Sequence, residues 1–189
     1  MTKWSPPVTN RLGGKHTIVI GCLIVVGVGV DQITKALAVA RLVPGRPIQL
    51  VGDLFQFSLY RNPGASFSMG AGLTLLFTFL AVAVLVGTLA WVVPKVRCWT
   101  WAVAVGLGLA GVAGNLIDRL VRAPGPFRGH VVDFLALKHF AVFNVADVLL
   151  TSAAGLIVLL TVFFRRDFDG RGLGPRAKPV VTPEGEGPC

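Results

Sequence analysis

Residues 99–117 read WTWAVAVGLGLAGVAGNLI, an apolar stretch without a charged residue. A helix that crosses the roughly 30 Å hydrocarbon core of a bilayer needs about 20 mainly apolar residues. The backbone finds no water in that core, so a spanning segment must satisfy its own hydrogen bonds as an α-helix. This stretch therefore predicts a transmembrane helix.

Three further apolar runs have the same character, and they cover residues 17–39, 71–93 and 145–164. The first is too long for a cleaved signal peptide, lacks a small-residue cleavage site and contains Asp31 and Lys35. The sequence therefore predicts a mainly α-helical membrane protein with four transmembrane helices.

Composition supports this prediction and excludes other classes of protein. Apolar residues make up 53% of the chain and charged residues 14%, against about 25% charged residues in a typical soluble domain. The net charge is +9, but the basic residues lie between apolar runs and form no compact patch, so no nucleic-acid partner is expected. The three cysteines lack the spacing of a metal site, and no metal or cofactor is expected.

Basic residues favour the cytoplasmic side of a membrane, which sets the expected orientation. With four crossings both termini lie on one side, and that side carries Lys3, Arg11, Lys15, Lys95, Arg97, Arg165, Arg166, Arg171, Arg176 and Lys178. The other side carries Arg41, Arg46, Arg61, Arg119, Arg122, Arg128 and Lys138. The bias of ten over seven favours both termini in the cytoplasm.

This orientation divides the chain. We expect a cytoplasmic N-terminal segment at residues 1–16, a membrane domain at 17–164 and a disordered cytoplasmic tail at 165–189, which is rich in Gly, Pro and charge. Two long loops, residues 40–70 and 118–144, would lie outside the membrane.

The first outer loop contains a strand signal. In Phe55–Tyr60 large apolar residues alternate with more polar ones, and Arg61-Asn62-Pro63-Gly64 predicts a turn. We expect a small sheet on the membrane surface between the first two helices. The alternative is an edge hairpin that only covers helix ends.

The predicted topology brings most polar residues of the spans to the outer interface. These residues are Asp31, Lys35, Asn115, Asp118, Arg119, Asn144 and Asp147. Ionisable groups inside spans are costly and usually functional. A cluster at one interface favours a site there over a proton-coupled carrier, whose acidic residues would lie near the middle of the bilayer.

Several of these residues also have a purely structural interpretation. Asp31 and Lys35 are four apart on one helical face, and a structural ion pair is favoured. Asp118 ends a helix, where a carboxylate needs a cation, and Arg119 or Arg122 could supply one. Its structural and substrate-orienting roles remain equally open.

Asp147 and Asp133 are the candidate catalytic pair. Asn144 and Asp147 have the spacing of a helix capping box, and capping is the favoured interpretation from spacing alone. Asp133 lies among apolar residues, and Asp147 is its available partner at the same depth. Two carboxylates in one desolvated site cannot easily both ionise, so the pair could hold one proton and activate water. A noncatalytic assembly or anchoring protein would need no such pair.

Five short motifs occur in order along residues 21–164. They are Asp31-Gln32-Ile33-Thr34-Lys35, Asn62-Pro63-Gly64-Ala65-Ser66-Phe67, Gly114-Asn115-Leu116-Ile117-Asp118-Arg119, Val131-Val132-Asp133-Phe134 and Phe143-Asn144-Val145-Ala146-Asp147. With four predicted spans, they make the chain resemble the lipoprotein signal peptidases, the signal peptidase II family of bacterial membrane aspartic proteases.

The resemblance implies an enzyme that removes the signal peptide of a diacylglyceryl-modified prolipoprotein by cleaving before the lipidated cysteine. It assigns the catalytic dyad to Asp133 and Asp147. It also implies that the site and substrate are held by Asp31, Lys35, Asn62, Gly64, Asn115, Asp118, Arg119 and Asn144. It further implies a β-cradle in the first outer loop, membrane phospholipid as surroundings, globomycin-type inhibitors, a monomer, and a site near the outer face of the bacterial cytoplasmic (inner) membrane.

The sequence departs from the family pattern at three places. Ala110, Gly111 and Val112 replace a common Gly-Gly-Ala, and Ser66 stands where Ala is frequent. Residues 122–128 make the connection from Asp118 to Asp133 longer than in many members.

Overall fold

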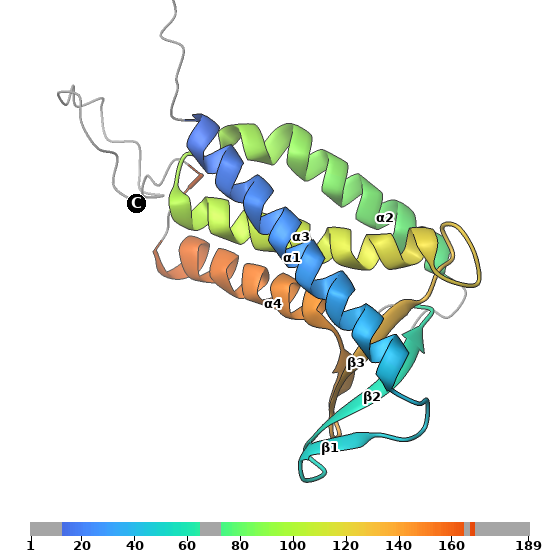
Figure 1. The fold of residues 1–189 in the computed structure, drawn as a ribbon. Helices are drawn as coiled ribbons and strands as arrows, with labels where there is room; N and C mark the ends of the chain where they lie inside the picture. Colours follow the sequence, from blue (N-terminus) through green and yellow to red (C-terminus); the bar gives the residue numbers. More distant parts are fainter. Residues whose placement is uncertain (1–12, 65–72, 165–166, 169–189) are drawn as a thin grey trace, which may run out of the picture.

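Four helices form a bundle with a small sheet at one end, in a computed structural model that describes residues 13–64, 73–164 and 167–168 (Figure 1). The helices are α1 (Gly13–Arg41), α2 (Thr74–Gly87), α3 (Trp99–Val121) and α4 (Val145–Val158). Wider or tighter turns extend α2 through Thr88–Val92 and Val93–Lys95, and α4 through Leu159–Phe163. All four are long and apolar enough to cross a membrane, which agrees with the four predicted spans.

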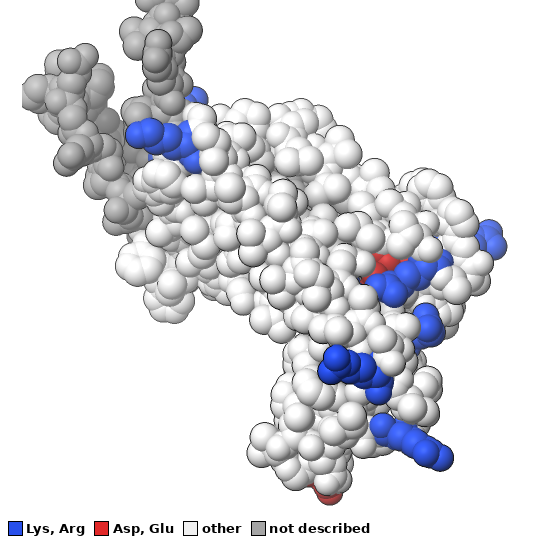
Figure 2. Space-filling model, viewed as in Figure 1, with Lys and Arg blue, Asp and Glu red and all other residues white. Residues whose placement is uncertain are grey.

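Charge is distributed as a membrane protein requires. On the face shown in Figure 2, Lys and Arg gather at the two ends of the bundle, and the surface between them is uncharged. We call the end where α1 and α3 finish the sheet end, because the sheet projects from it (Figure 1).

Helix α3 lies at the centre of the bundle and carries many of its buried residues. Its small residues let neighbouring helices approach closely. A Cβ added at Gly111 would lie 2.5 Å from the Ala146 carbonyl oxygen, and one at Gly114 would lie 2.6 Å from Asp31 Oδ2. The two glycines therefore bring α1 and α4 against the end of α3 at which the polar residues lie.

The sheet contains four antiparallel strands in the order β1-β2-β3-β4. They are β1 (Ile48–Val51), β2 (Phe55–Asn62), β3 (Val131–Leu137) and β4 (Ala141–Phe143). The predicted strand at 55–60 is confirmed, but it continues through Arg61 and Asn62, which we expected in the turn. The turn is displaced because both residues pair with β3.

Half of the sheet comes from the second long loop, residues 118–144, where we had predicted no strand. The first four residues of β3, Val131 to Phe134, are all buried, so both faces are covered and the alternation of a half-exposed strand is absent. The β2–β3 pairing aligns Tyr60 with Asp133. The sheet therefore connects the two long loops and positions a candidate catalytic residue.

Some predicted boundaries differ from the helix ends of the structure or lie outside the described residues. Helix α1 begins at Gly13 rather than residue 17. The expected tail lies outside the described residues except for Asp167 and Phe168, and the Phe168 ring lies 4.5 Å from that of Trp101. Ser66 and the expected start of the second helix at residue 71 also lie outside them.

Candidate active site

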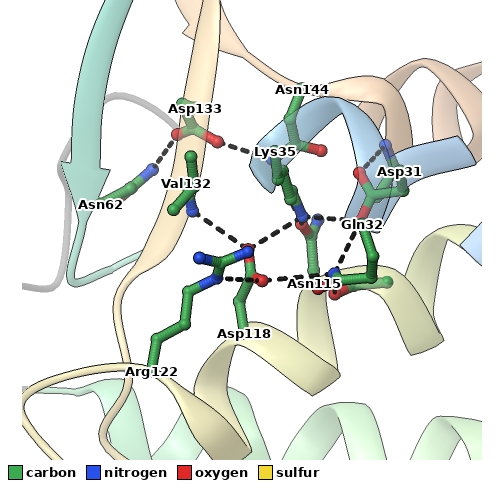
Figure 3. A network of polar contacts seen from close by, with 12 residues as sticks. Asp31, Gln32, Lys35, Asn62, Asn115, Asp118, Arg122, Val132, Asp133 and Asn144 are labelled. Carbon is green, nitrogen blue, oxygen red and sulfur yellow. Dashed lines mark hydrogen bonds and ion pairs between the residues drawn. The ribbon is translucent and has the colours of Figure 1, made fainter. Parts of the chain in front are cut away.

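Asp133 lies on β3 with its side chain directed at two amide donors. The residue is 2% exposed. Asn62 Nδ2, from the end of β2, donates to Asp133 Oδ2 at 3.0 Å, and Asn144 Nδ2 donates to Asp133 Oδ1 at 2.6 Å (Figure 3). Both carboxylate oxygens are therefore hydrogen-bonded inside a site that excludes most water.

Asp147 lies on the first turn of α4 and is oriented by the helix cap. Asn144 Oδ1 accepts from the Asp147 backbone N–H at 3.1 Å, and Asp147 Oδ2 accepts from the Asn144 backbone N–H at 3.1 Å. The predicted capping box is thus present. The second oxygen, Asp147 Oδ1, accepts from Asn115 Nδ2 at 2.9 Å. Capping therefore determines the direction of this carboxylate.

The two carboxylates line one cavity of about 560 Å³. Asn144 connects them, since its Nδ2 also donates to Asn115 Oδ1 at 3.2 Å, and Asn115 in turn donates to Asp147. The cavity wall includes polar groups from Asn62 and Arg119. Its apolar part includes Val131, Phe140, Phe143 and Val148. The pair expected from the sequence is brought together here.

Burial, together with the nearby charge of Asp147, raises the pKa of Asp133 to about 6, against the opposing effects of Asn62, Asn144 and Lys35. A carboxyl with this pKa can hold or release a proton near neutral pH. Two neighbouring carboxylates that share one proton can act together as a general base and a general acid.

Lys35 is the centre of a buried ion network next to Asn115, which donates to Asp147. Its Nζ lies 2.8 Å from Asp31 Oδ2 and 3.0 Å from Asp118 Oδ2, and all three side chains are fully buried. It also donates to Asn115 Oδ1 at 3.0 Å (Figure 3). The predicted Asp31–Lys35 pair is confirmed, and Asp118 is its second partner.

The cation that Asp118 needed is also supplied by Arg122, whose Nε lies 2.6 Å from Asp118 Oδ1. Gln32, to which we had assigned no role, lies within hydrogen-bond distance of the same group. Its Nε2 lies 3.1 Å from Asp31 Oδ2, 3.2 Å from Asp118 Oδ1 and 3.0 Å from the Gly114 carbonyl. Its position beside Asp31 in the motif was the only sequence signal for it.

Arg119 faces the cavity rather than Asp118. Its Nη2 donates to the Gly64 carbonyl at 2.9 Å, and Gly64 N–H donates to Asn62 Oδ1 at 3.0 Å. Its Nη1 is buried and has no hydrogen-bond partner among the described residues. Arg119 therefore holds the backbone that follows β2, and its Nη1 is a donor that no described residue uses.

His130 and His139 are not among the residues that line the cavity, although their chain neighbours Val131 and Phe140 are. His139 is exposed in the turn between β3 and β4, and His130 precedes β3. Among the residues the structure describes, no group of three or more His, Cys, Asp or Glu side chains could hold a metal ion.

Comparison with known proteins finds one matching family and several similar relatives. The family described as signal peptidase (SPase) II matches residues 23–164. A lipoprotein signal peptidase of Mycobacterium avium (strain 104) is 46% identical over 147 residues, which cover 78% of this chain and 80% of the relative. One of Rhodococcus jostii (strain RHA1) is 47% identical over 156 residues, which cover 82% of this chain and 76% of the relative.

A solved structure supports the fold. A bacterial membrane enzyme determined by the in meso method at 2.3 Å resolution has a TM-score of 0.66 and 24% identity. The match covers 79% of this chain and 88% of that one. At this identity the likeness shows the fold, and the family follows from the sequence matches. This chain therefore belongs to the signal peptidase II family of membrane aspartic proteases.

Proposed function

We propose that this chain removes signal peptides from diacylglyceryl-modified prolipoproteins, cleaving before the lipidated cysteine with Asp133 and Asp147 as the catalytic pair. The observation that carries the proposal is that both carboxylates line one cavity and are joined through Asn144 and Asn115. Family membership supports the substrate class.

In this mechanism the pair begins with one proton. The ionised aspartate takes a proton from water as its oxygen attacks the scissile carbonyl, and the protonated aspartate donates to the carbonyl oxygen. The tetrahedral intermediate then breaks its C–N bond. The leaving nitrogen takes a proton from one aspartate, and the other aspartate takes a proton from a hydroxyl group of the intermediate, which restores the one-proton pair. The products are a signal peptide with a new carboxylate and a lipidated cysteine with a free amino group. The two aspartates titrate jointly, so the roles belong to the pair.

The position of the cavity suits a lipidated substrate. We infer that the sheet end faces outward and that both termini lie in the cytoplasm. The reason is that Lys and Arg are more numerous on the membrane side that carries the termini than on the side that carries the sheet. The acyl chains would then stay in the outer leaflet of the inner membrane, among phospholipids, while the modified cysteine reaches the dyad at headgroup depth. The apolar wall of the cavity would contact the peptide.

Arg119 is the substrate-holding residue that this arrangement favours. Its Nη1 has no partner among the described residues, and both Arg119 and Asn115 line the cavity. We infer that this nitrogen donates to an oxygen of the substrate backbone or headgroup. Globomycin-type inhibitors would occupy the same cavity, and the enzyme would act as a monomer.

The test is cleavage of a diacylglyceryl-modified prolipoprotein by the purified full chain in lipid nanodiscs, with and without globomycin. Asp133→Asn and Asp147→Asn should each abolish cleavage without loss of folded protein, whereas Asp53→Asn should cleave normally. Asp53 is a suitable control because it is exposed and its carboxylate bonds the surface groups Gln49 and Lys138. Cleavage at the wild-type rate by either dyad variant would overturn the assignment.

Cysteine labelling in intact cells tests the orientation. Single cysteines placed at Asp53 and at Lys95 should react with a membrane-impermeant maleimide from opposite sides of intact cells, with Asp53 labelled from outside. The labelling would be carried out in a background without the native cysteines. Labelling of Asp53 only after permeabilisation would contradict the proposed outward-facing site.

A further inference from the structure

We propose that Thr74 and Thr78 of α2 are positioning residues for Asp133, acting through the two outer connections that lead to it. The inference rests on the proposed role of Asp133. It concerns a helix that contributes no side chain to the dyad and two residues that none of the recognised motifs contains.

The two threonines share one face of α2, because residues four apart lie one above the other on a helix. They are also the two buried residues of Thr74–Gly87, at 8% and 0% exposure. An otherwise apolar helix thus buries two hydroxyl groups at its sheet end. A buried hydroxyl costs free energy unless it is hydrogen-bonded, so the acceptors of these two groups show what they do.

Thr74 is bonded to the first outer connection. Its hydroxyl donates to the Pro63 carbonyl. Pro63 follows Asn62, whose amide donates to Asp133 Oδ2 at 3.0 Å. Thr74 therefore fixes the backbone next to one of the two donors that orient the Asp133 carboxylate.

Thr78 is bonded to the second connection. Its Oγ1 lies 2.9 Å from the Phe127 carbonyl oxygen and 2.8 Å from the Thr74 carbonyl oxygen. The Thr74 carbonyl is the ordinary acceptor for the Thr78 backbone N–H in a helix. Because the Thr74 carbonyl already has this donor, we assign the single hydroxyl proton of Thr78 to the Phe127 carbonyl. This carbonyl lies in the long connection between α3 and β3.

Phe127 needs such support because its φ is +64°, a region that bulky residues rarely adopt. Its ring also stacks on Phe79 of α2, with centroids 6.2 Å apart and planes 17° apart. Helix α2 thus holds both the backbone and the ring of one strained residue.

The chain between Phe127 and Asp133 has little freedom to absorb a shift. A Cβ at Gly129 would lie 2.2 Å from the Asp118 carbonyl oxygen, and Gly129 N–H donates to the Arg119 carbonyl at 3.0 Å. Val132 N–H then donates to Asp118 Oδ2 at 3.1 Å. A displacement at Phe127 would therefore be transmitted to β3 and to Asp133.

The experiment compares hydroxyl with methyl at position 78. Thr78→Val keeps the shape and removes the hydroxyl, whereas Thr78→Ser keeps the hydroxyl. Thr161→Val is the matched control, because Thr161 Oγ1 also bonds the carbonyl four residues earlier in its own helix, Ile157, at 2.8 Å. Each variant is assayed as the full chain in nanodiscs for kcat, KM and thermal unfolding, with the diacylglyceryl-modified prolipoprotein as substrate.

We expect Thr78→Val to lower kcat about tenfold, because small misplacements of catalytic groups have large effects on rate. KM should change less than about twofold, since ground-state binding is retained. Thr78→Ser should recover most of the wild-type kcat, and Thr161→Val should match wild type. Thr74→Val should resemble Thr78→Val.

Wild-type kcat in Thr78→Val would overturn the inference, as would equal losses in Thr78→Ser and Thr78→Val. Should Thr78→Val fail to fold, Thr78→Ala against Thr78→Ser gives the same comparison, because both lack the methyl group and only Ser has the hydroxyl. The two proposals fail differently. No cleavage by the wild-type chain contradicts the proposed function, whereas normal cleavage by wild type and Thr78→Val contradicts only this inference.

Discussion

The side chain of Asp118 accepts a hydrogen bond from the backbone N–H of Val132 at 3.1 Å, one residue before Asp133. Asp31 has the same relationship with the other proposed catalytic residue, since its Oδ1 accepts from the Ala146 N–H at 2.9 Å, one residue before Asp147. Lys35 lies between the two acids and bonds both. The ion network thus fixes the two backbone segments that carry the dyad, relative to each other.

Lys35→Met should strongly destabilise the protein, because it leaves the buried carboxylates of Asp31 and Asp118 without their shared cation. Removing one partner of a buried ion pair costs about 3–5 kcal/mol, and we expect a loss of that order in the free energy of unfolding. Lys138→Met is the control, since its pair with Asp53 is exposed and should contribute about 0–1 kcal/mol. Denaturant unfolding in detergent measures both, and equal small losses would contradict a structural role for the network.

Asp133 should give the protein a specific pH dependence of stability. Its pKa is raised from 3.8 to about 6 in the folded chain, so between these values the folded state binds more protons than the unfolded state. The contribution of Asp133 to the free energy of unfolding is therefore fully present below pH 4 and is lost as the pH rises to 6. The loss is roughly 3 kcal/mol, since each pKa unit corresponds to about 1.36 kcal/mol.

Asp133→Asn removes this titration, so wild type should lose stability relative to the variant between about pH 4 and pH 6. The measurement is the difference in unfolding free energy between the two proteins across this range, with Asp53→Asn as the surface control. A difference that is constant with pH, or that rises in favour of wild type, would show that the pKa of Asp133 is not raised.

The contacts that residue spacing alone predicted are between residues close in the chain. Asp31–Lys35 and Asn144–Asp147 follow from helix geometry and capping rules, which depend only on spacing. The contacts of Lys35 with Asp118, of Asp31 with Ala146 and of Thr78 with Phe127 join distant segments. No local pattern specifies them. Strand β3 was missed for a related reason, because its burial on both faces depends on the bundle it packs against.

Asn144 combines two functions that a substitution can separate. Its side-chain oxygen caps α4 and its amide donates to Asp133 and Asn115. Asn144→Ser should keep the cap and most of the stability but lose the amide donor, and kcat should fall at least about tenfold. Asn144→Ala should lose the cap as well, with a further loss of about 1 kcal/mol in the free energy of unfolding.

Kinetics and unfolding of both Asn144 variants in the same nanodiscs check this separation. If Asn144→Ser retained the wild-type kcat, its amide would not orient Asp133. If Asn144→Ala were as stable as Asn144→Ser, the cap would not contribute to the stability of α4.

Two glycines of α3 provide a paired test of how the network is packed. A Cβ at Gly114 would lie 2.6 Å from Asp31 Oδ2 and 3.2 Å from the Cβ of Ala146, whereas one at Gly108 would lie 3.5 Å from the Cβ of Ala153, an ordinary contact. Gly114→Ala must therefore displace Asp31 from Lys35 or push α4 away, and overpacking of this kind costs about 1–3 kcal/mol.

Gly108→Ala should be neutral or slightly stabilising, because alanine is favoured over glycine within a helix by about 1 kcal/mol. We therefore expect Gly114→Ala to lower the temperature of thermal unfolding and Gly108→Ala to leave it unchanged or raise it slightly. Cleavage activity should fall with Gly114→Ala and remain with Gly108→Ala, since only Gly114 contacts the acid that holds the backbone before Asp147. Equal behaviour of the two variants would mean that the close approach of α1 to α3 does not position the dyad.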